Sequence, residues 1–314
     1  MDQHKQIFFP LAYRAAEEAK KLGNRFAYYT TAEVAFSVVK HKRIWMRSTT
    51  TMNDYLELQY GRDLLLEAVN SKSGAELKAA VDSCYAGLFD EAWALVTAWI
   101  PGFLADTFIT CVSQHHPEED VLGRLSMWRA YGGKTGVALV FNGAVFDLQT
   151  NALGAYSSPV SYLDKKQFLS AIELVASNIA ANHEYVSSLS RDAVKNTLFT
   201  MFRFAVLCTK HPGFAEEKEW RIVASPALHQ STLLESEVAV VRGVPQPILK
   251  IPLENFPDQG IAGLAVPELV NRIIIGPCEF PHVTFRALWL ALNHSGVEDP
   301  ESLIIQSHIP LRHV

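Results

Sequence analysis

Lys210–Arg221 reads K-H-P-G-F-A-E-E-K-E-W-R and leads directly into the apolar segment Ile222-Val223-Ala224. The apolar residues predict a buried strand, and alternation along that strand would place Glu217 and Glu219 on one face. Two carboxylates on one face at the start of a core strand suit general acid–base chemistry or stabilisation of a cation. The alternative interpretation is a solvated strand entry whose charges pair with one another.

Strands and helices are predicted on both sides of this segment. Short β-branched or aromatic runs indicate strands, and longer periodic stretches indicate helices. Strands are predicted at 25–30, 44–47, 107–113, 136–141, 160–162, 220–224, 238–241, 248–251, 272–275 and 303–307. Helices are predicted at 11–22, from residue 31 to near Lys42, at 121–131 and at 280–293, with helical insertions at about 55–105 and 165–208. Because strands and helices do not alternate regularly, we expect one mixed α+β domain over residues 1–314 rather than a doubly wound sheet.

Composition narrows the possible classes of protein. The 314 residues carry a formal net charge of −5, which argues against broad binding of nucleic acid. The cysteines are far apart and form no Cys-x-x-Cys motif, so free thiols are expected. Ala92–Val112 is the longest apolar stretch, but Pro101, Gly102 and Asp106 interrupt it, so no membrane span is expected. The N-terminus lacks a signal-peptide pattern, and a cytoplasmic location is predicted.

Several smaller motifs have structural as well as functional interpretations. Thr30 with Glu33 fits a capping box at the start of a helix. Asn53-Asp54-x-x-Glu57 follows a strand and opens a helix, where such residues also serve as caps. Trp128 and Tyr131 share one helix face, which is typical of core packing as well as of a ligand shelf. The sequence contains neither the Gly-x-Gly-x-x-Gly motif nor the Gly-x(4)-Gly-Lys-Ser/Thr motif of nucleotide-binding loops. No metal site is expected at the neighbouring histidines His115-His116.

The charged stretch itself permits two kinds of chemistry. Glu216-Glu217-Lys218 has the Glu-x-Lys form of half of a metal-dependent nuclease site, in which acids hold a cation and lysine steadies a phosphate. No convincing partner aspartate is evident. Glu217-x-Glu219 instead has the form of a carboxylate pair that handles a ribosyl cation.

Several motifs occur in order over about residues 25–313. They are Tyr29-Thr30, Asn53-Asp54-x-x-Glu57, Ser126-Met127-Trp128-x-x-Tyr131, Gly136-Val137, Val160-x-Tyr162, Lys210-x(3)-Phe214-x(2)-Glu217-x-Glu219-Trp220-Arg221, Ile273-Ile274-Ile275-Gly276-Pro277 and Ser307-x-Ile309-Pro310-x-Arg312. Their order and spacing resemble the bacterial family known as domain of unknown function 2971. Phe214 stands where that family more often has tryptophan, so the position stays aromatic. The family name implies no activity.

The order of elements also resembles an ADP-ribosyltransferase catalytic domain, which implies a split, mainly antiparallel β-sheet core and NAD as the substrate. Tyr28-Tyr29-Thr30 would occupy the first strand position, where that fold usually has Arg or His. Ser113 would end the second strand, and Glu217-x-Glu219 would supply the third element. A preplaced carboxylate stabilises the positive charge that develops on ribose when the nicotinamide bond breaks.

This resemblance implies a role for each candidate residue. Glu219 would stabilise the ribosyl cation, Glu217 would orient the acceptor, and Ser113 would steer the glutamate. Tyr28 or Trp128 would stack on nicotinamide. Arg47, Lys210 and Arg221 are the candidates to bind the diphosphate. The cofactor-binding candidates are Tyr28, Tyr29, Thr30, Arg47, Asn53, Trp128, Tyr131, Lys210 and Arg221.

Three functions therefore remain open on the sequence. The first is an NAD-consuming transferase or glycohydrolase with an unknown acceptor, which by analogy suggests toxin or phage-defence biology. The second is a noncatalytic module that senses a ligand or binds a protein, in which the charged cluster is structural. The third is a metal-dependent nuclease.

Overall fold

The computed structural model describes residues 2–51, 55–148, 150–241 and 243–309. The chain divides into two compact units, each built from three separate segments. The helical unit comprises Met1–Glu17, Thr49–Thr107 and Ser158–Ala215, and the sheet unit comprises Glu18–Ser48, Phe108–Ser157 and Glu216–Val314. The long helical segments predicted at 55–105 and 165–208 both fall in the helical unit.

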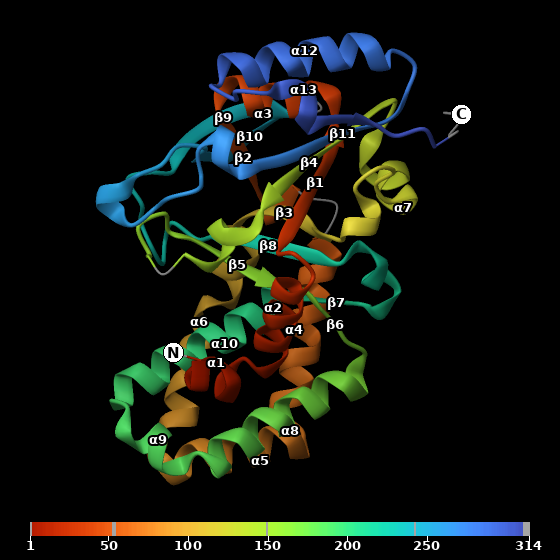
Figure 1. Cartoon of the computed structure of the whole chain (residues 1–314). Coiled ribbons are helices and arrows are strands. Elements are labelled where there is room, and N and C mark those ends of the chain that lie inside the picture. The colour runs from red at the N-terminus through yellow and green to blue at the C-terminus, as the bar shows by residue number, and fades with distance from the viewer. Residues whose placement is uncertain (1, 52–54, 149, 242, 310–314) are drawn as a thin grey trace. The chain divides into compact units, whose positions relative to one another are not determined.

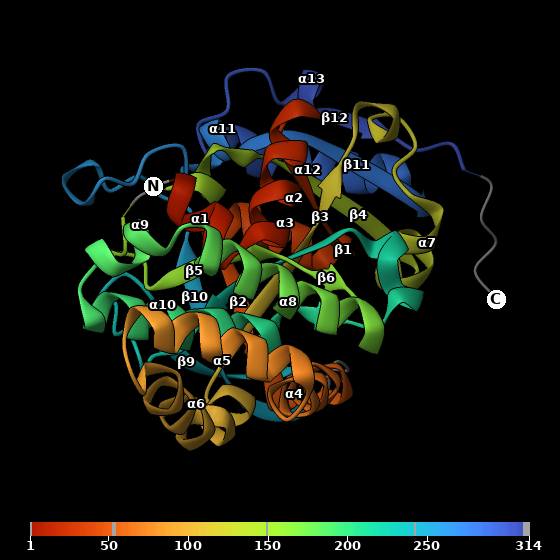
Figure 2. The ribbon, with the colours of Figure 1, turned by 90° about the horizontal axis from the view of Figure 1, so that it is seen from below.

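The helical unit is a set of packed helices with a small parallel sheet. Helix α5 packs against α8, and α10 packs against α4 and α6 (Figure 2). Its helices are α1 (Asp2–Phe8), α4 (Tyr55–Val69), α5 (Lys72–Cys84), α6 (Leu88–Ala105), α8 (Lys165–Ala181), α9 (His183–Ser188) and α10 (Arg191–Leu207). Strands β6 (Ser161–Tyr162) and β7 (Thr209–Lys210) pair in parallel. Helix α2 (Pro10–Lys21) begins in this unit and ends in the sheet unit.

The sheet unit is built on a mixed, mainly antiparallel sheet, as predicted. The strands are β1 (Arg25–Thr31), β2 (Arg43–Ser48), β3 (Phe108–His115), β4 (Thr135–Asn142), β5 (Ala155–Pro159), β8 (Glu219–Ala224), β9 (Glu235–Val241), β10 (Val244–Pro252), β11 (Val270–Cys278) and β12 (Ile304–Gln306). The main path runs β12-β11-β4-β1-β3-β2-β10-β9, and β8 pairs with both β3 and β5. Only the pairing of β11 with β12 is parallel among the registers described for this sheet.

Strand β3 is the centre of this sheet because three strands share it. Its C-terminal residues 113–115 pair with β1, and its N-terminal residues 108–109 pair with β2 on the same edge. Residues 110–112 lie between these two paired stretches, where β1 and β2 diverge. The other edge of β3 pairs along its length with β8. Strands β1 and β2 therefore share one edge of β3, and β8, which carries Glu219, pairs with the other edge.

Helices cover one face of this sheet (Figure 1). Helix α3 (Ala32–His41) contacts β1, β2 and β4, and α12 (Pro281–His294) packs on α3 and β11. Short helices α11 (Val266–Leu269) and α13 (Pro300–Leu303) flank β11. The cap of α3 is Thr31 rather than the predicted Thr30, because the Thr31 hydroxyl accepts from the amide of Val34. Lys42, with φ of 53°, ends the helix.

The helix predicted at 121–131 is shorter and less regular. Helix α7 spans only Leu125–Met127 and continues as a π-helical turn, Trp128–Gly132. Gly123 has φ of +67°, so the chain before Arg124 is not helical. No helix among the described residues is long and apolar enough to cross a bilayer.

Candidate functional site

Glu217 and Glu219 belong to different secondary-structure elements. Glu217 ends a 3-10 turn, Pro212–Glu217, whereas Glu219 is the first residue of β8. Lys218 between them has φ of 46°, in the left-handed region that non-glycine residues rarely adopt. The prediction that strand alternation places both carboxylates on one face was therefore wrong, because the strand does not extend through Lys218.

Glu219 lies beside Ser113 and forms a buried ion pair. Ser113 on β3 is its register partner, and directly opposed residues of an antiparallel pair share one face of the sheet. The Glu219 Oε1 atom accepts a hydrogen bond from Nε of Arg221 at 2.7 Å, and the two side chains are 7% and 2% exposed. The pairing of β3 with β8 thus brings the predicted serine and glutamate together.

Glu217 occupies a more open position. Its carboxylate accepts a hydrogen bond from the Tyr131 hydroxyl at 3.2 Å, and Tyr131 is exposed. Its main-chain oxygen accepts from the Ser113 hydroxyl at 2.5 Å. Ser113 therefore contacts the backbone of Glu217, which is one way for it to steer the carboxylate pair.

Arg124 joins these residues, although no motif drew attention to it. Its guanidinium donates to the Ser113 hydroxyl at 2.8 Å and to the main-chain oxygens of Glu216 and Glu217 at 2.8 and 3.2 Å. It also donates to the carboxylate of Glu119, with Nη2 and Oε1 separated by 2.8 Å. The available sequence signal was a single charge inside the otherwise uncharged run V-L-G-R-L-S-M-W, residues 121–128.

A second group of charged side chains interacts with residues 115–120, which precede Arg124 in the chain. His115 is fully buried, and its Nε2 atom lies 2.9 Å from Oδ1 of Asp120. Burial lowers the pKa of His115, although Asp120 and the charge of Glu119 oppose the shift. Burial disfavours the ionised form of Asp120, but hydrogen bonds from Arg25 and His115 and the charges of Arg25 and Arg272 outweigh it and lower its pKa. These contacts indicate an ionised Asp120 beside a neutral histidine at neutral pH.

Three predicted cofactor-binding residues, Tyr28, Thr30 and Arg47, lie where β1 and β2 diverge along β3. Burial raises the pKa of Tyr28, whose side chain hydrogen-bonds those of Thr110 and Thr30 and senses the charge of Arg47. Arg47 in turn donates to Oε1 of Gln246 at 3.1 Å. Because these residues come from β1, β2 and β3, the divergence of β1 from β2 creates the cluster. It lies across β3 from the strand that holds Glu219.

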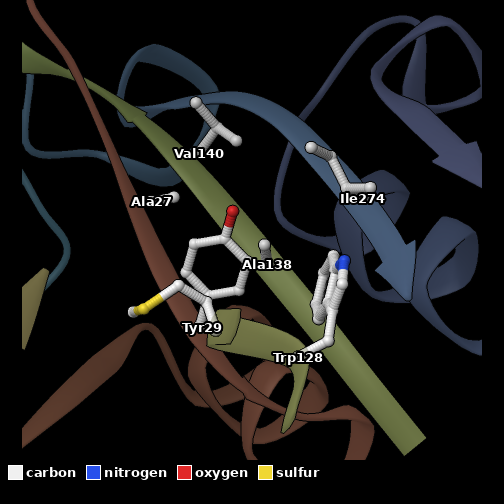
Figure 3. Close-up of a cluster of buried hydrophobic side chains, with 7 residues drawn as sticks. Ala27, Tyr29, Trp128, Ala138, Val140 and Ile274 are labelled. Carbon is white, nitrogen blue, oxygen red and sulfur yellow. The ribbon is translucent and has the colours of Figure 1, made fainter. Parts of the chain in front are cut away.

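Trp128 has a different environment from the one a stacking role requires (Figure 3). It is 2% exposed and contacts Tyr29 edge to face, with the ring centroids 4.8 Å apart. Its indole nitrogen donates to the main-chain oxygen of Leu122 at 2.9 Å. A Cβ atom would lie within 3.0 Å of the indole ring at each of three glycines, Gly123, Gly136 and Gly276. Because the Trp128 ring is buried among these described neighbours, the proposed site does not use it.

The remaining predicted residues are placed as follows. Tyr29 packs in the same core as Trp128 (Figure 3), and burial raises its pKa to about 12. Its hydroxyl accepts from the amide of Arg124 at 3.0 Å. Lys210 belongs to the helical unit, where its Nζ atom lies 4.9 Å from the ring centroid of Phe214. Asn53 lies outside the described residues.

The Glu216-Glu217-Lys218 segment is arranged unlike a half-site for a metal. The Glu216 side chain is exposed, and the Nζ atom of Lys218 lies 3.9 Å from Oε1 of Glu119. Within the described ranges, no three His, Cys, Asp or Glu side chains are grouped as metal ligands. No observation here favours the nuclease interpretation over the other two.

One protein family matches the chain. The model of the family described as "Protein of unknown function (DUF2971)" matches residues 127–222, which confirms the predicted resemblance over that segment. The matched segment contains Trp128, Tyr131 and both residues of the Glu217-x-Glu219 pair. No curated protein and no solved structure shows significant similarity to the chain.

Proposed function

We propose that this protein is an NAD-consuming enzyme, an ADP-ribosyltransferase-like transferase or an NAD glycohydrolase. The observation that carries the proposal is the register pairing of Ser113 with Glu219 across β3 and β8. The resemblance implied a serine at the end of one strand beside the glutamate, and Ser113 lies two residues before the end of β3, opposite the first residue of β8. The pairing of both β1 and β2 with one edge of β3 supports the proposal further.

In the proposed reaction the bond between C1′ of the ribose and nicotinamide breaks, and the electron pair leaves with nicotinamide. The carboxylate of Glu219 stabilises the positive charge that develops on the ribose. A nucleophile, either water or a group on an acceptor, then bonds to C1′ and loses its proton. Glu217, which is more open and is hydrogen-bonded by Tyr131, is placed to orient that nucleophile.

Tyr28, Thr30 and Arg47, which lie where β1 and β2 diverge along β3, would bind the rest of the substrate. Tyr28 offers a ring and Thr30 a hydroxyl group, and Arg47 offers a cation of the type that binds a diphosphate. Arg221, on the strand next to β3, is a second cation on the side of Glu219. The acceptor is left open in this proposal.

Release of nicotinamide tests the proposal directly. Purified wild type would be incubated with excess NAD without added metal, together with Glu219→Gln and the control Glu235→Gln. Glu235 is also a paired glutamate of this unit, but it contacts Arg43 at the surface. We expect release by wild type and by the control and loss of release in Glu219→Gln. Full activity of Glu219→Gln would contradict the assignment of this residue.

The burial of the Glu219–Arg221 pair favours a second candidate, a noncatalytic module that senses a ligand or binds a protein. A fully paired and enclosed carboxylate also fits a structural role. Melting curves of wild type with and without NAD separate the two candidates. A lower melting temperature for Glu219→Gln, with neither a shift nor nicotinamide release from NAD in wild type, would support the noncatalytic module.

A further inference from the structure

The backbone at Glu216–Lys218 is held in an unfavourable conformation by several contacts at once. Lys218 adopts φ of 46°, which is unfavourable for a residue with a Cβ atom. Its main-chain oxygen accepts from the amide of Gln114 at 2.8 Å, and those of Glu216 and Glu217 accept from Arg124. Such conformations persist where surrounding contacts over-determine them, and they are frequent at functional sites.

The contacts of Arg124 require a guanidinium group and could not all be made by the single ammonium group of a lysine. Its Nη1 atom bonds Ser113, Glu216 and Glu217, and its Nη2 and Nε atoms bond Glu119, with a further bond from Nη2 to the main-chain oxygen of Gln114 at 3.0 Å. A planar guanidinium presents its donors in a rigid fork, whereas lysine has a single ammonium group.

Arg124 is itself fixed to the core of the sheet unit. Its amide donates to the Tyr29 hydroxyl at 3.0 Å, and Gly123 before it is left-handed against the Trp128 ring. The side chain is 9% exposed, and its partner Glu119 also accepts from the amide of His116. Arg124 therefore connects the core around Trp128 with the main chain of Glu216–Lys218.

We propose that Arg124 is a positioning residue that holds Glu216–Lys218 in one backbone conformation and so sets the directions of the Glu217 and Glu219 carboxylates. Its importance for catalysis rests on the proposed function, but the conformational role does not. Ser113 assists, because its hydroxyl accepts from Arg124 and donates to the oxygen of Glu217.

Hydrogen exchange tests the conformational role whether or not the protein is an enzyme. The variants are Arg124→Lys, which keeps the charge, and Ser113→Ala, which removes the second donor to Glu217. The control is Arg272→Gln, which removes an arginine whose Nη1 atom contacts the carboxylate and the main-chain oxygen of Asp120. We expect exchange at the Gln114 amide and in residues 216–222 to become at least about ten-fold faster in Arg124→Lys.

Exchange in β4 should stay as in wild type, and the control should leave residues 216–222 unchanged. Unchanged exchange at Gln114 and 216–222 in both Arg124→Lys and Ser113→Ala would overturn the proposal. An equal acceleration in β4 would also overturn it, because it would show general destabilisation instead of a local role.

Kinetics tests the link to catalysis. If wild type releases nicotinamide, Arg124→Lys should lower kcat by about 10- to 100-fold with little change in KM, since misplacement of a reacting group mainly slows the chemical step. Faster exchange without a change in kcat would remove the link to catalysis. If wild type releases no nicotinamide, the proposed function fails, and the exchange data alone decide the role of Arg124.

Discussion

Glu219 and Arg221 lie two residues apart on β8, and their side chains meet as a buried ion pair with 2.7 Å between Oε1 and Nε. Residues i and i+2 of a strand point to the same face, so the strand itself brings the two charges together. The same strand places Glu219 opposite Ser113. Stability and the proposed chemistry therefore depend on the same carboxylate, which is why the two have to be measured separately.

Removing the arginine of this pair should destabilise the protein strongly. Arg221→Met leaves Glu219 buried beside an apolar side chain, and loss of one partner of a buried pair costs about 3–5 kcal/mol. The control is Glu235→Gln, because Glu235 pairs with Arg43 at a solvent-exposed site, where a pair contributes at most about 1 kcal/mol. Urea unfolding of both variants measures the difference. Similar small losses in the two variants would show that the buried pair is not important for stability.

Substitution of Gly123 should be more harmful than its backbone angle alone implies. A Cβ atom there would lie 2.5 Å from the Trp128 ring, in addition to the strain of φ at +67°. Gly243 is a matched control, since its φ is +82° and no atom lies within 4 Å of the added Cβ. We expect Gly123→Ala to lose about 1–3 kcal/mol more than Gly243→Ala, because overpacking adds to the strain. If denaturant unfolding shows equal losses of unfolding free energy in Gly123→Ala and Gly243→Ala, the close packing of Gly123 against the Trp128 ring would be contradicted.

The Tyr29 hydroxyl should contribute to stability through the amide of Arg124. Tyr29→Phe leaves that buried amide without the acceptor that lies 3.0 Å away, which should cost about 1–3 kcal/mol. Tyr131→Phe removes an exposed hydroxyl and should change the free energy of unfolding by no more than about 0.5 kcal/mol. A larger loss in Tyr131→Phe than in Tyr29→Phe would contradict this comparison.

His115 should make the sheet unit less stable in mild acid. Burial lowers its pKa below the ordinary histidine value of 6.5, so the unfolded chain binds the proton more readily. Stability should therefore fall as the pH drops below 6.5, by up to about 1.4 kcal/mol per pH unit until the folded pKa is reached. The lowered pKa of Asp120 acts only at lower pH, because its stabilisation is lost as the pH falls below the ordinary aspartate value of 3.8.

Urea unfolding of wild type and His115→Gln between pH 7.5 and 5 measures this effect. The groups that face His115 are Asp120, Glu119 and Arg25, and all are present in both proteins. His4, whose pKa burial also lowers, gives a background that the two proteins share. We expect a shallower pH dependence in the variant, and parallel curves would contradict the assignment to His115.

The sequence by itself was sufficient to predict the main strands of the core. The apolar runs around Ile109, Val140 and Ile274 became buried strands. Strands buried on both faces, as around Val140 and Ile274, need consecutive apolar residues, and such a run is visible in the sequence. The mixed, mainly antiparallel sheet and the family over residues 127–222 also agree with the predictions. The meeting of Ser113 with Glu219 followed from the order of elements in a resembling fold.

Tertiary structure decided the details of the candidate site. Alternation failed at Glu217 because Lys218 turns left-handed, and that turn is held by Arg124 and Ser113, which lie 93 and 104 residues from Glu217 in the chain. The sequence also did not indicate that three glycines from separate segments of the chain lie against the Trp128 ring. Patterns along a strand record burial of neighbouring residues. Contacts between residues so distant in sequence produce no repeating pattern in the sequence. Only the folded chain shows which side chains these contacts orient.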